Sequence, residues 1–168
     1  AGGWLVEYTI NAPMESAMSP HITALSELIG SDNLTTESEI LASHGLDWTR
    51  FYDPKPTAVA FPRTIEHVKS LVDFARQHKI GRVPSGGRTG LSGGAVANNG
   101  EIVVSFDRMN RLDAVDPINR TVVCQPGVVT QALQEHAAAS GLFFPVDFAS
   151  AGSSQVGGNI ATNAGGIN

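Results

Sequence analysis

The sequence predicts an α+β domain built on a small mixed sheet with flanking helices. Strand-like runs and helical runs alternate along the chain, but without the regular repeat of a doubly wound sheet. Two glycine-rich segments, residues 84–94 and 152–166, lie far apart in the sequence. With 168 residues, of which 42% are hydrophobic, the chain is long enough to bury one core.

The first 17 residues read as a leader or an added extension, because Met18 followed by Ser19 and Pro20 resembles a natural start. A weak strand is predicted within this stretch, where four large apolar side chains alternate with other residues. These are Trp4, Val6, Tyr8 and Ile10.

Residues 18–53 form a predicted helical segment ahead of the main domain. Ser19 and Pro20 suit the first positions of a helix over about 20–29, and Gly30 suits its end. Thr36 opens a capping-box pattern that predicts a second short helix ending near Gly45. The prolines of residues 53–56 favour an extended linker, which places the start of the main domain at residue 54.

Residues 54–168 carry the expected sheet. Thr64 caps a predicted helix that runs to about Lys79 between two strands, and this order predicts a parallel strand pair with a right-handed crossover. A later helix over about 129–140 ends at Gly141. The predicted strands are 58–61, 80–83, 102–106, 112–116 and 121–125.

The segment 84–94, named here the first glycine segment, holds five of the chain's 18 glycines. Glycine allows close backbone approach and positive φ, and successive N–H groups can form an anion-binding nest suited to a pyrophosphate. Such a loop is costly in backbone entropy, so we expect a ligand to order it. Residues 152–166, the second glycine segment, are interpreted as the opposite wall of one dinucleotide cofactor site.

Charge and motif content exclude several functions. A net charge of −5 argues against nucleic acid and anionic membranes as partners, and no apolar run is long enough to span a bilayer. The single cysteine, Cys124, rules out an intrachain disulfide and favours a small buried side chain in a reducing compartment. The five histidines show no metal-ligand spacing, and neither a Walker A lysine nor the Rossmann glycine pattern occurs.

A serine hydrolase is the alternative raised by residues 90–94, which fit the G-x-S-x-G nucleophile elbow around Ser92. That elbow needs a helix directly after the serine and a downstream histidine. Residues 95–100 are a poor helix, and His136 is the one histidine that follows. The hydrolase is therefore the weaker hypothesis.

The two glycine segments, together with residues 108–111, 124–127 and 144–147, resemble the FAD-linked oxidases and dehydrogenases of the vanillyl-alcohol-oxidase type, which carry a PCMH-type FAD-binding domain. The resemblance extends from about Pro56 to Asn168 and is greatest to the D-2-hydroxyacid dehydrogenases. It implies that this chain is an N-terminal fragment, the first part of that domain, truncated before the second subdomain.

By this resemblance, backbone amides of the first glycine segment would hold the FAD pyrophosphate, and the second would line the flavin and ribityl side. Arg88 stands where relatives with covalent FAD often carry histidine, so the resemblance implies non-covalent FAD; Arg88 itself would face a phosphate or solvent. The implied cofactor contacts are Pro84, Ser85, Gly86, Gly87, Arg88, Thr89, Gly90, Leu91, Ser92, Pro145, Asp147, Gly152, Ser153, Gly157, Gly158, Asn159, Ala161 and Asn163.

The resemblance implies oxidation of D-lactate, D-2-hydroxyglutarate or glycolate to the 2-oxoacid by hydride transfer to FAD. The catalytic base and most substrate contacts would lie beyond residue 168, so no residue here is assigned as catalytic, and no metal is expected. Alternatives are an alditol oxidase or enolpyruvyl reductase of the same fold, or a non-catalytic half-domain that needs a partner chain. We expect a cytoplasmic protein, with peripheral membrane association as the alternative, and self-association through exposed apolar sheet edges.

Overall fold

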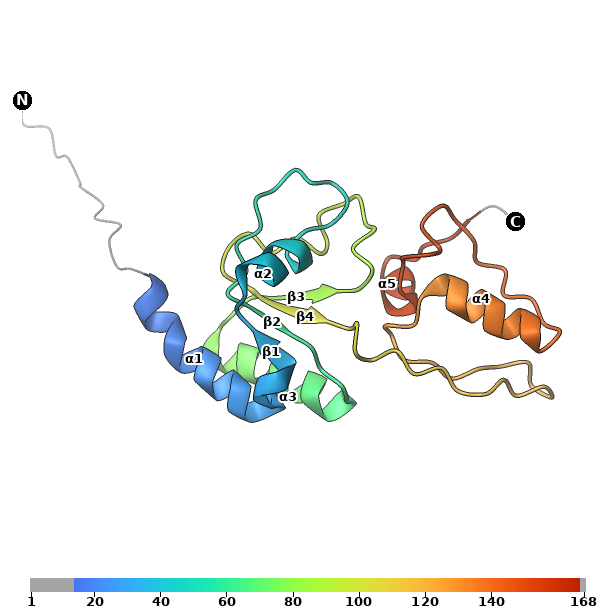
Figure 1. Ribbon diagram of the computed structural model, residues 1–168, viewed down its shortest axis with the longest axis horizontal. Helices are drawn as coiled ribbons and strands as arrows, with labels where there is room; N and C mark the ends of the chain where they lie inside the picture. The colour runs from blue at the N-terminus through green and yellow to red at the C-terminus, as the bar shows by residue number, and fades with distance from the viewer. Residues whose placement is uncertain (1–13, 167–168) are drawn as a thin grey trace, which may run out of the picture.

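The computed structural model describes residues 14–166, with side chains described from residue 20. Residues in this range form a small mixed sheet with helices around it, as the sequence predicts (Figure 1). The elements are α1 (Met14–Ile29), a 3₁₀ turn (Ser31–Asn33), β1 (Leu34–Thr35), α2 (Ser38–His44), β2 (Ala58–Ala60), α3 (Ile65–His78), β3 (Arg82–Ser85), β4 (Ile102–Ser105), α4 (Thr130–Ala139) and α5 (Val156–Ala161).

The sheet has the strand order β1-β2-β4-β3. β2 and β3 each pair with β4 in parallel, whereas β1 pairs with β2 antiparallel. The register aligns Ser85 at the end of β3 with Ser105 at the end of β4. Because carboxyl ends of parallel strands share one edge of a sheet, the segments that follow β3 and β4 start side by side.

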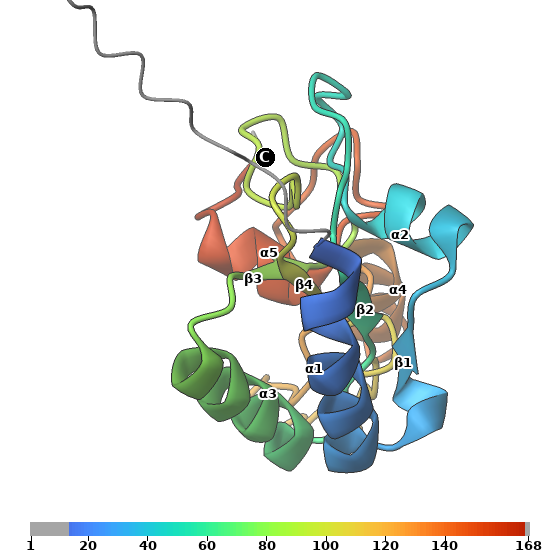
Figure 2. The ribbon, with the colours of Figure 1, turned by 90° about the vertical axis from the view of Figure 1, so that its left-hand side faces the viewer.

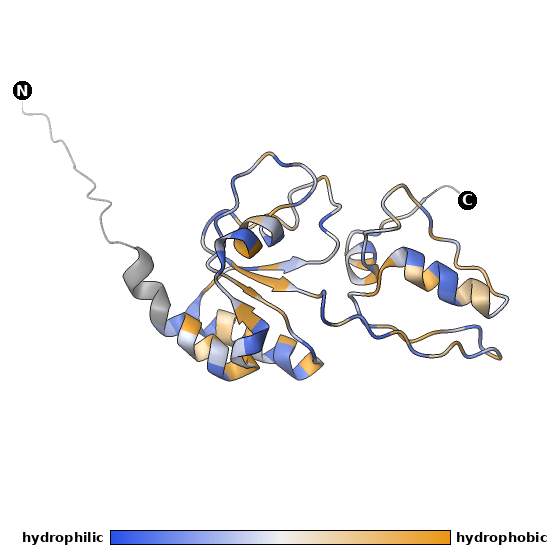
Figure 3. Cartoon of the chain, viewed as in Figure 1, coloured by the Kyte–Doolittle hydropathy of each residue, from blue (hydrophilic) through white to orange (hydrophobic). Residues whose placement is uncertain are grey.

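The buried strands divide the core between the two faces of the sheet. Ala60, Ile102 and Val104 point to the face covered by α1 and α3, where Leu25 and Leu71 join them. In Figure 2, α1 and α3 lie side by side on this face. The alternate residues of the same strands pack under α2 on the other face, which is the two-residue period of a β-strand. Both clusters are apolar, as the hydropathy colours of the strands show (Figure 3).

The C-terminal part of the chain lies beyond the edge of the sheet toward which β3 and β4 run (Figure 1). It contains α4, α5 and a hairpin-like pair of segments joined by isolated antiparallel bridges between Leu112 and Cys124 and between Asp116 and Thr121. The predicted turn at 116–119 is present, because the Asp116 carboxylate accepts the backbone N–H groups of Ile118 and Asn119. α4 and α5 therefore stand next to the sheet edge where the first glycine segment begins.

The predicted helices exist, but two of their starts are wrong. α1 begins at Met14 rather than near residue 20, so Pro20 lies inside the helix, where it contributes no N–H. α2 begins at Ser38 with Glu37 at its N-cap and no side-chain cap, so Thr36 does not form a capping box. By contrast, the Thr64 hydroxyl accepts the His67 N–H at 3.2 Å, and Gly141 takes φ +70° after α4. The strand predicted near residues 4–10 lies outside the described residues.

The sheet differs from the prediction in which strands are adjacent and in where the strands begin and end. The strands at 58–61 and 80–83 are parallel but not paired, since β4 lies between them. β3 begins at Arg82 and extends to Ser85, and therefore includes the start of the first glycine segment. Segments 112–116 and 121–125 form bridges instead of continuous strands. The helix α5, inside the second glycine segment, was not predicted, because glycine pairs normally disfavour helix.

Candidate functional site

The first glycine segment leaves the sheet at the carboxyl end of β3. Among residues 14–166, no acceptor is found for the backbone N–H groups of residues 86–92. Arg88 takes φ +56°, an uncommon conformation for a side-chain-bearing residue. A row of unpaired amides with an αL residue among them is the arrangement of an anion-binding nest. The loop can thus hold several oxygens of one anionic group.

The two glycine segments touch. A Cβ placed on Gly87 would lie 2.1 Å from the carbonyl oxygen of Ser153, and one on Gly86 would lie 3.3 Å from Oε1 of Gln155. Only glycine permits the first of these approaches. The structure therefore brings the predicted walls together at Gly87, Ser153 and Gln155, the N-cap residue of α5.

Asp107 connects both segments to the sheet, and sequence reasoning did not identify it. It follows β4 closely, and its Oδ1 accepts Nε2 of Gln155 at 2.7 Å. Its Oδ2 accepts Nη1 of Arg88 at 3.4 Å and lies 3.2 Å from Nε2 of His44, at the end of α2. The signal available in the sequence was a lone aspartate just after a buried strand, which is too common to mark a site.

The environment of Asp107 keeps its carboxylate ionised. Partial burial raises the pKa of the Asp107 carboxyl, but hydrogen bonds from His44 and Gln155, with the charge of Arg88, outweigh burial and hold the pKa well below its usual range. Arg88 was expected to face either a phosphate or solvent. Its Nη1 also donates to the Gly86 carbonyl at 3.0 Å, and its orientation toward a phosphate or solvent stays a prediction.

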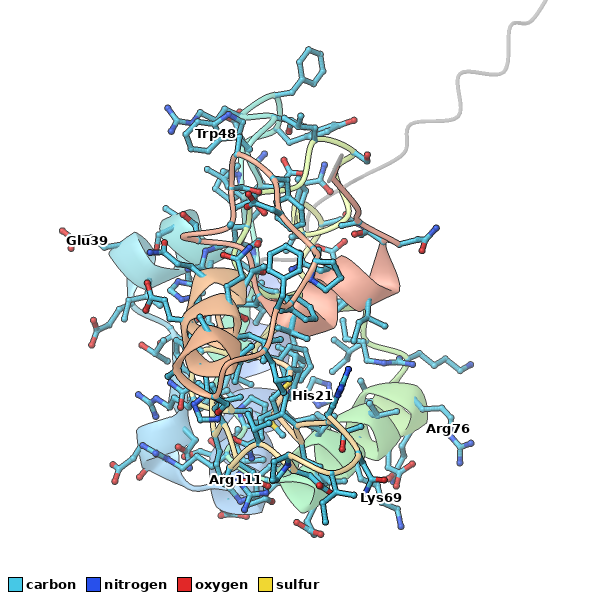
Figure 4. All side chains as sticks on the ribbon, turned by 90° about the vertical axis from the view of Figure 1, so that its right-hand side faces the viewer. His21, Glu39, Trp48, Lys69, Arg76 and Arg111 are labelled. Atoms are coloured by element: carbon cyan, nitrogen blue, oxygen red, sulfur yellow. The ribbon has the colours of Figure 1, made fainter. Side chains whose placement is uncertain are left out.

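Residues 44–52, named here the strap, are hydrogen-bonded to the outer end of the first glycine segment. The buried Asp47 accepts the Gly93 N–H at 2.7 Å and the Thr49 N–H at 2.9 Å, and the Trp48 N–H donates to the Gly90 carbonyl at 3.0 Å. Figure 4 shows Trp48 at one end of the molecule, with its side chain at the surface. An open cleft beside the loop is lined by Ser43, Leu46, Asp47, Trp48, Arg50, Gly87 and Arg88.

The second glycine segment is held by a buried polar cluster at the start of α4. The Thr130 hydroxyl lies 2.8 Å from that of Ser154 and accepts Nδ2 of Asn159 at 2.6 Å. The Gly157 N–H donates to the Pro126 carbonyl at 2.8 Å, and a Cβ on Gly157 would overlap the Pro126 ring. These contacts explain how a six-residue helix with two glycines forms here.

The remaining predicted contacts differ in exposure, and two of them, Pro145 and Asp147, lie outside both glycine segments. Asp147 lies beside α4, where its Oδ1 accepts Nε2 of Gln134 at 3.3 Å. Ser85 is buried; Gly86, Gly87, Arg88, Thr89, Gly157 and Asn159 are half-buried; Pro84, Gly90, Leu91, Ser92, Pro145, Asp147, Gly152, Ser153, Gly158, Ala161 and Asn163 are exposed.

The hydrolase hypothesis fails on geometry. The described helix that follows Ser92 is α4, far downstream, so no nucleophile elbow forms. His136 uses Nε2 to bond the Asp113 carbonyl at 2.9 Å. Among the described side chains, which start at residue 20, no three His, Cys, Asp or Glu gather as metal ligands, and no described helix is long and apolar enough to cross a bilayer.

Two buried polar atoms at the junction of the glycine segments bear on whether a polar cofactor fits there. Oγ of Ser85 and Oε1 of Gln155 have no hydrogen-bond partner among the described residues, although both residues are at least nine-tenths buried. Both flank Gly86, at the start of the unpaired amides. Unsatisfied buried polar atoms are costly, so their position favours a polar ligand at this junction. The residues present therefore fit a group such as the FAD pyrophosphate.

Comparison with known families decides between the hypotheses. The FAD binding domain family matches residues 56–168. The chain belongs to this family. The prediction of FAD as cofactor is thereby confirmed, and the strap residues 44–52 lie upstream of the matched region.

Known relatives and folds agree with the family. The chain is 55% identical over 146 residues to a D-2-hydroxyglutarate dehydrogenase of Stutzerimonas stutzeri, covering 87% of this chain and 32% of that protein. It is 47% identical over 148 residues to one of Xanthomonas citri, covering 88% and 31%. The chain thus spans about a third of the length of these relatives. An alkyldihydroxyacetonephosphate synthase structure shares the fold, with a TM-score of 0.78 and 23% identity over 88% of this chain and 32% of that one.

Gly87→Ala tests the contact between the segments. We expect the free energy of unfolding to fall by about 2 kcal/mol or more, because the new methyl group meets backbone that cannot rotate away. Urea denaturation measures this change. Gly94→Ala is the matched control, since a Cβ there meets nothing within 4 Å. Equal, small effects of the two substitutions would contradict the contact.

Asp107→Asn tests the ionised carboxylate through pH. At pH 6 we expect it to lower the free energy of unfolding by about 2 kcal/mol, the worth of a hydrogen bond to a charged group. The folded pKa is depressed, so the contribution of Asp107 is full above its ordinary pKa of 3.8 and is lost progressively as pH falls below that value. The gap between the two unfolding curves should therefore shrink at pH 3.

The exposed pair of Asp113 with Arg111, at 3.4 Å, supplies the control. Asp113→Asn should change stability by less than about 0.5 kcal/mol. A gap between unchanged protein and Asp107→Asn that stays constant from pH 6 to 3 would show that Asp107 is not preferentially ionised in the folded chain.

Proposed function

We propose that this chain is the FAD-binding portion of a flavoprotein dehydrogenase that oxidises a D-2-hydroxyacid to the 2-oxoacid. D-2-hydroxyglutarate is the favoured substrate, supported by the names of the relatives at 55% and 47% identity. D-lactate and glycolate remain the other members of the substrate class. The single observation that carries the proposal is the junction of the two glycine segments, where Ser85 and Gln155, each with an unpartnered buried oxygen, lie beside Gly86 at the start of a run of amides without a described acceptor.

The residues of this chain would bind and orient the cofactor. The amides of residues 86–92 would donate to the pyrophosphate oxygens, each charge-assisted bond contributing about 1.5–3 kcal/mol. The exposed residues of the second glycine segment, with Pro145 and Asp147, would line the ribityl and flavin side. The chemistry that bound FAD supplies is acceptance of a hydride from the hydroxyl-bearing carbon of the substrate. The base and the groups that hold the substrate carboxylate would come from outside this chain.

We further propose that FAD is held without a covalent bond. Arg88 occupies the position after the paired glycines and is engaged by Asp107. Cys124 is half-buried on the hairpin of residues 112–124, and burial, with the nearby Asp113 charge, raises the pKa of its thiol, which lowers its nucleophilicity at neutral pH. A cytoplasmic location is proposed on the reducing environment that a single cysteine favours.

Flavin titration tests this proposal. Addition of the purified chain to FAD should quench flavin fluorescence to saturation and shift the visible absorption bands, and acid precipitation should release all flavin into the supernatant. Gly87→Ala should weaken binding at least tenfold, because loss of one charge-assisted hydrogen bond costs about 1.4 kcal/mol or more. Leu28→Ala, a change on the exposed side of α1, is the control and should keep the affinity.

Each result has a separate meaning. Failure of the unchanged chain to saturate would contradict FAD binding by these residues. Flavin retained in the acid pellet would contradict the non-covalent attachment. Equal affinity of Gly87→Ala and unchanged protein would place the cofactor away from the junction.

A further inference from the structure

The Asp107 side chain is hydrogen-bonded to both glycine segments and lies within hydrogen-bond distance of His44, the last residue of α2. Its two carboxylate oxygens have different partners. Oδ1 accepts a hydrogen bond from Gln155 of the second segment, and Oδ2 accepts one from Arg88 of the first and lies close to His44. The side chain is about one-third exposed, so these bonds are only partly screened by water. Among the described residues, Arg88 and Gln155 form no hydrogen bond with each other, and each is hydrogen-bonded to Asp107.

We propose that Asp107 is a positioning residue that fixes the two walls of the cofactor site relative to β4. The proposal rests on the proposed FAD-binding function and concerns Asp107, to which the sequence analysis assigned no role. Without the Asp107 carboxylate, each wall would keep its own internal hydrogen bonds but lose its hydrogen bond to this residue just after β4.

On the first wall, Asp107 acts through Arg88. The Arg88 guanidinium bonds both Asp107 and the Gly86 carbonyl, and so bridges the sheet edge to the turn that holds the first unpaired amides. The φ of +56° at Arg88 is intrinsically unfavourable for a residue with a side chain, and this pair of bonds offsets that cost. The direction of the neighbouring amides therefore depends on Asp107.

On the second wall, Asp107 selects the orientation of one amide. An ionised carboxylate accepts hydrogen bonds and donates none, so it must face Nε2 of Gln155 rather than Oε1. The opposite end, Oε1, is then turned toward Gly86 and left unpaired at the junction. Asp107 thereby sets which polar atom the N-cap of α5 presents to a ligand.

A purely electrostatic role and a positioning role predict opposite changes in FAD affinity when the Asp107 charge is removed. A carboxylate near an anion site repels the anion, so simple removal of the Asp107 charge would strengthen FAD binding and free Arg88 to face a phosphate. A positioning role predicts the opposite, because the amides lose their alignment. Asp107→Asn should therefore weaken FAD binding about tenfold, and an unchanged or tighter dissociation constant would overturn the proposal.

A second readout needs no flavin. Backbone ¹⁵N relaxation of the ligand-free chain gives order parameters for residues 86–89 and 153–159. In unchanged protein both stretches should be rigid, near 0.85 or higher, and in Asp107→Asn both should fall toward about 0.6. Arg88→Met should loosen the first stretch alone, and Gln155→Met the second alone. Asp113→Asn, which breaks an exposed ion pair, should change neither stretch.

This pattern separates positioning from general destabilisation and from failure of the FAD proposal. In a merely destabilised fold, Arg88→Met would not loosen residues 86–89 alone, and Gln155→Met would not loosen residues 153–159 alone. If Asp107→Asn does not fold, Arg88→Met and Gln155→Met provide the test. The proposal is contradicted if either substitution fails to loosen the stretch that contains it, or loosens both stretches. If unchanged protein binds no FAD while the relaxation pattern holds, the proposed function fails and the positioning of the two segments by Asp107 stands.

Discussion

The backbone contact between Gly87 and Ser153 is the constraint on which the site depends. It joins two segments that are distant in the sequence, and it leaves no room for a side chain at residue 87. Next to this contact, Gln155 lies beside Gly86, the amides of residues 86–92 have no acceptor among the described residues, and Asp107 is hydrogen-bonded to Gln155 and Arg88. A site with two walls can bind an extended cofactor only if the spacing between those walls is fixed.

The sheet supplies the fixed frame for that spacing. β3 and β4 run parallel, so the first glycine segment and Asp107 both emerge from the same edge. Ligands of open α/β sheets commonly bind at this edge, outside the carboxyl ends of the strands. The strap extends the frame upstream of the family match, since Asp47 and Trp48 bond the outer part of the loop. The loop is thus held at both ends by carboxylates, whereas its glycine content suggested that a ligand alone would order it.

The sequence predicted what depends on local signals. The Thr64 cap, the turn at Asp116 and the stop at Gly141 each act within a few residues and are present in the structure. The fold class and the pairing of the two glycine segments were also predicted correctly. The insertion of β4 between β2 and β3 could not be, because strand order is set by non-local packing. Asp47 and Asp107 were missed for the same reason, since their partners are distant in sequence. The individual FAD contacts remain predictions.

The most direct measurement of the central claim follows backbone amide signals of the ¹⁵N-labelled chain as FAD is added. If the two glycine segments form one site, signals from residues 86–92 and from 152–159 should move together and give one dissociation constant. Signals from the hairpin of residues 112–124 should stay in place. Movement of one segment alone, or two different dissociation constants, would contradict a single site with two walls.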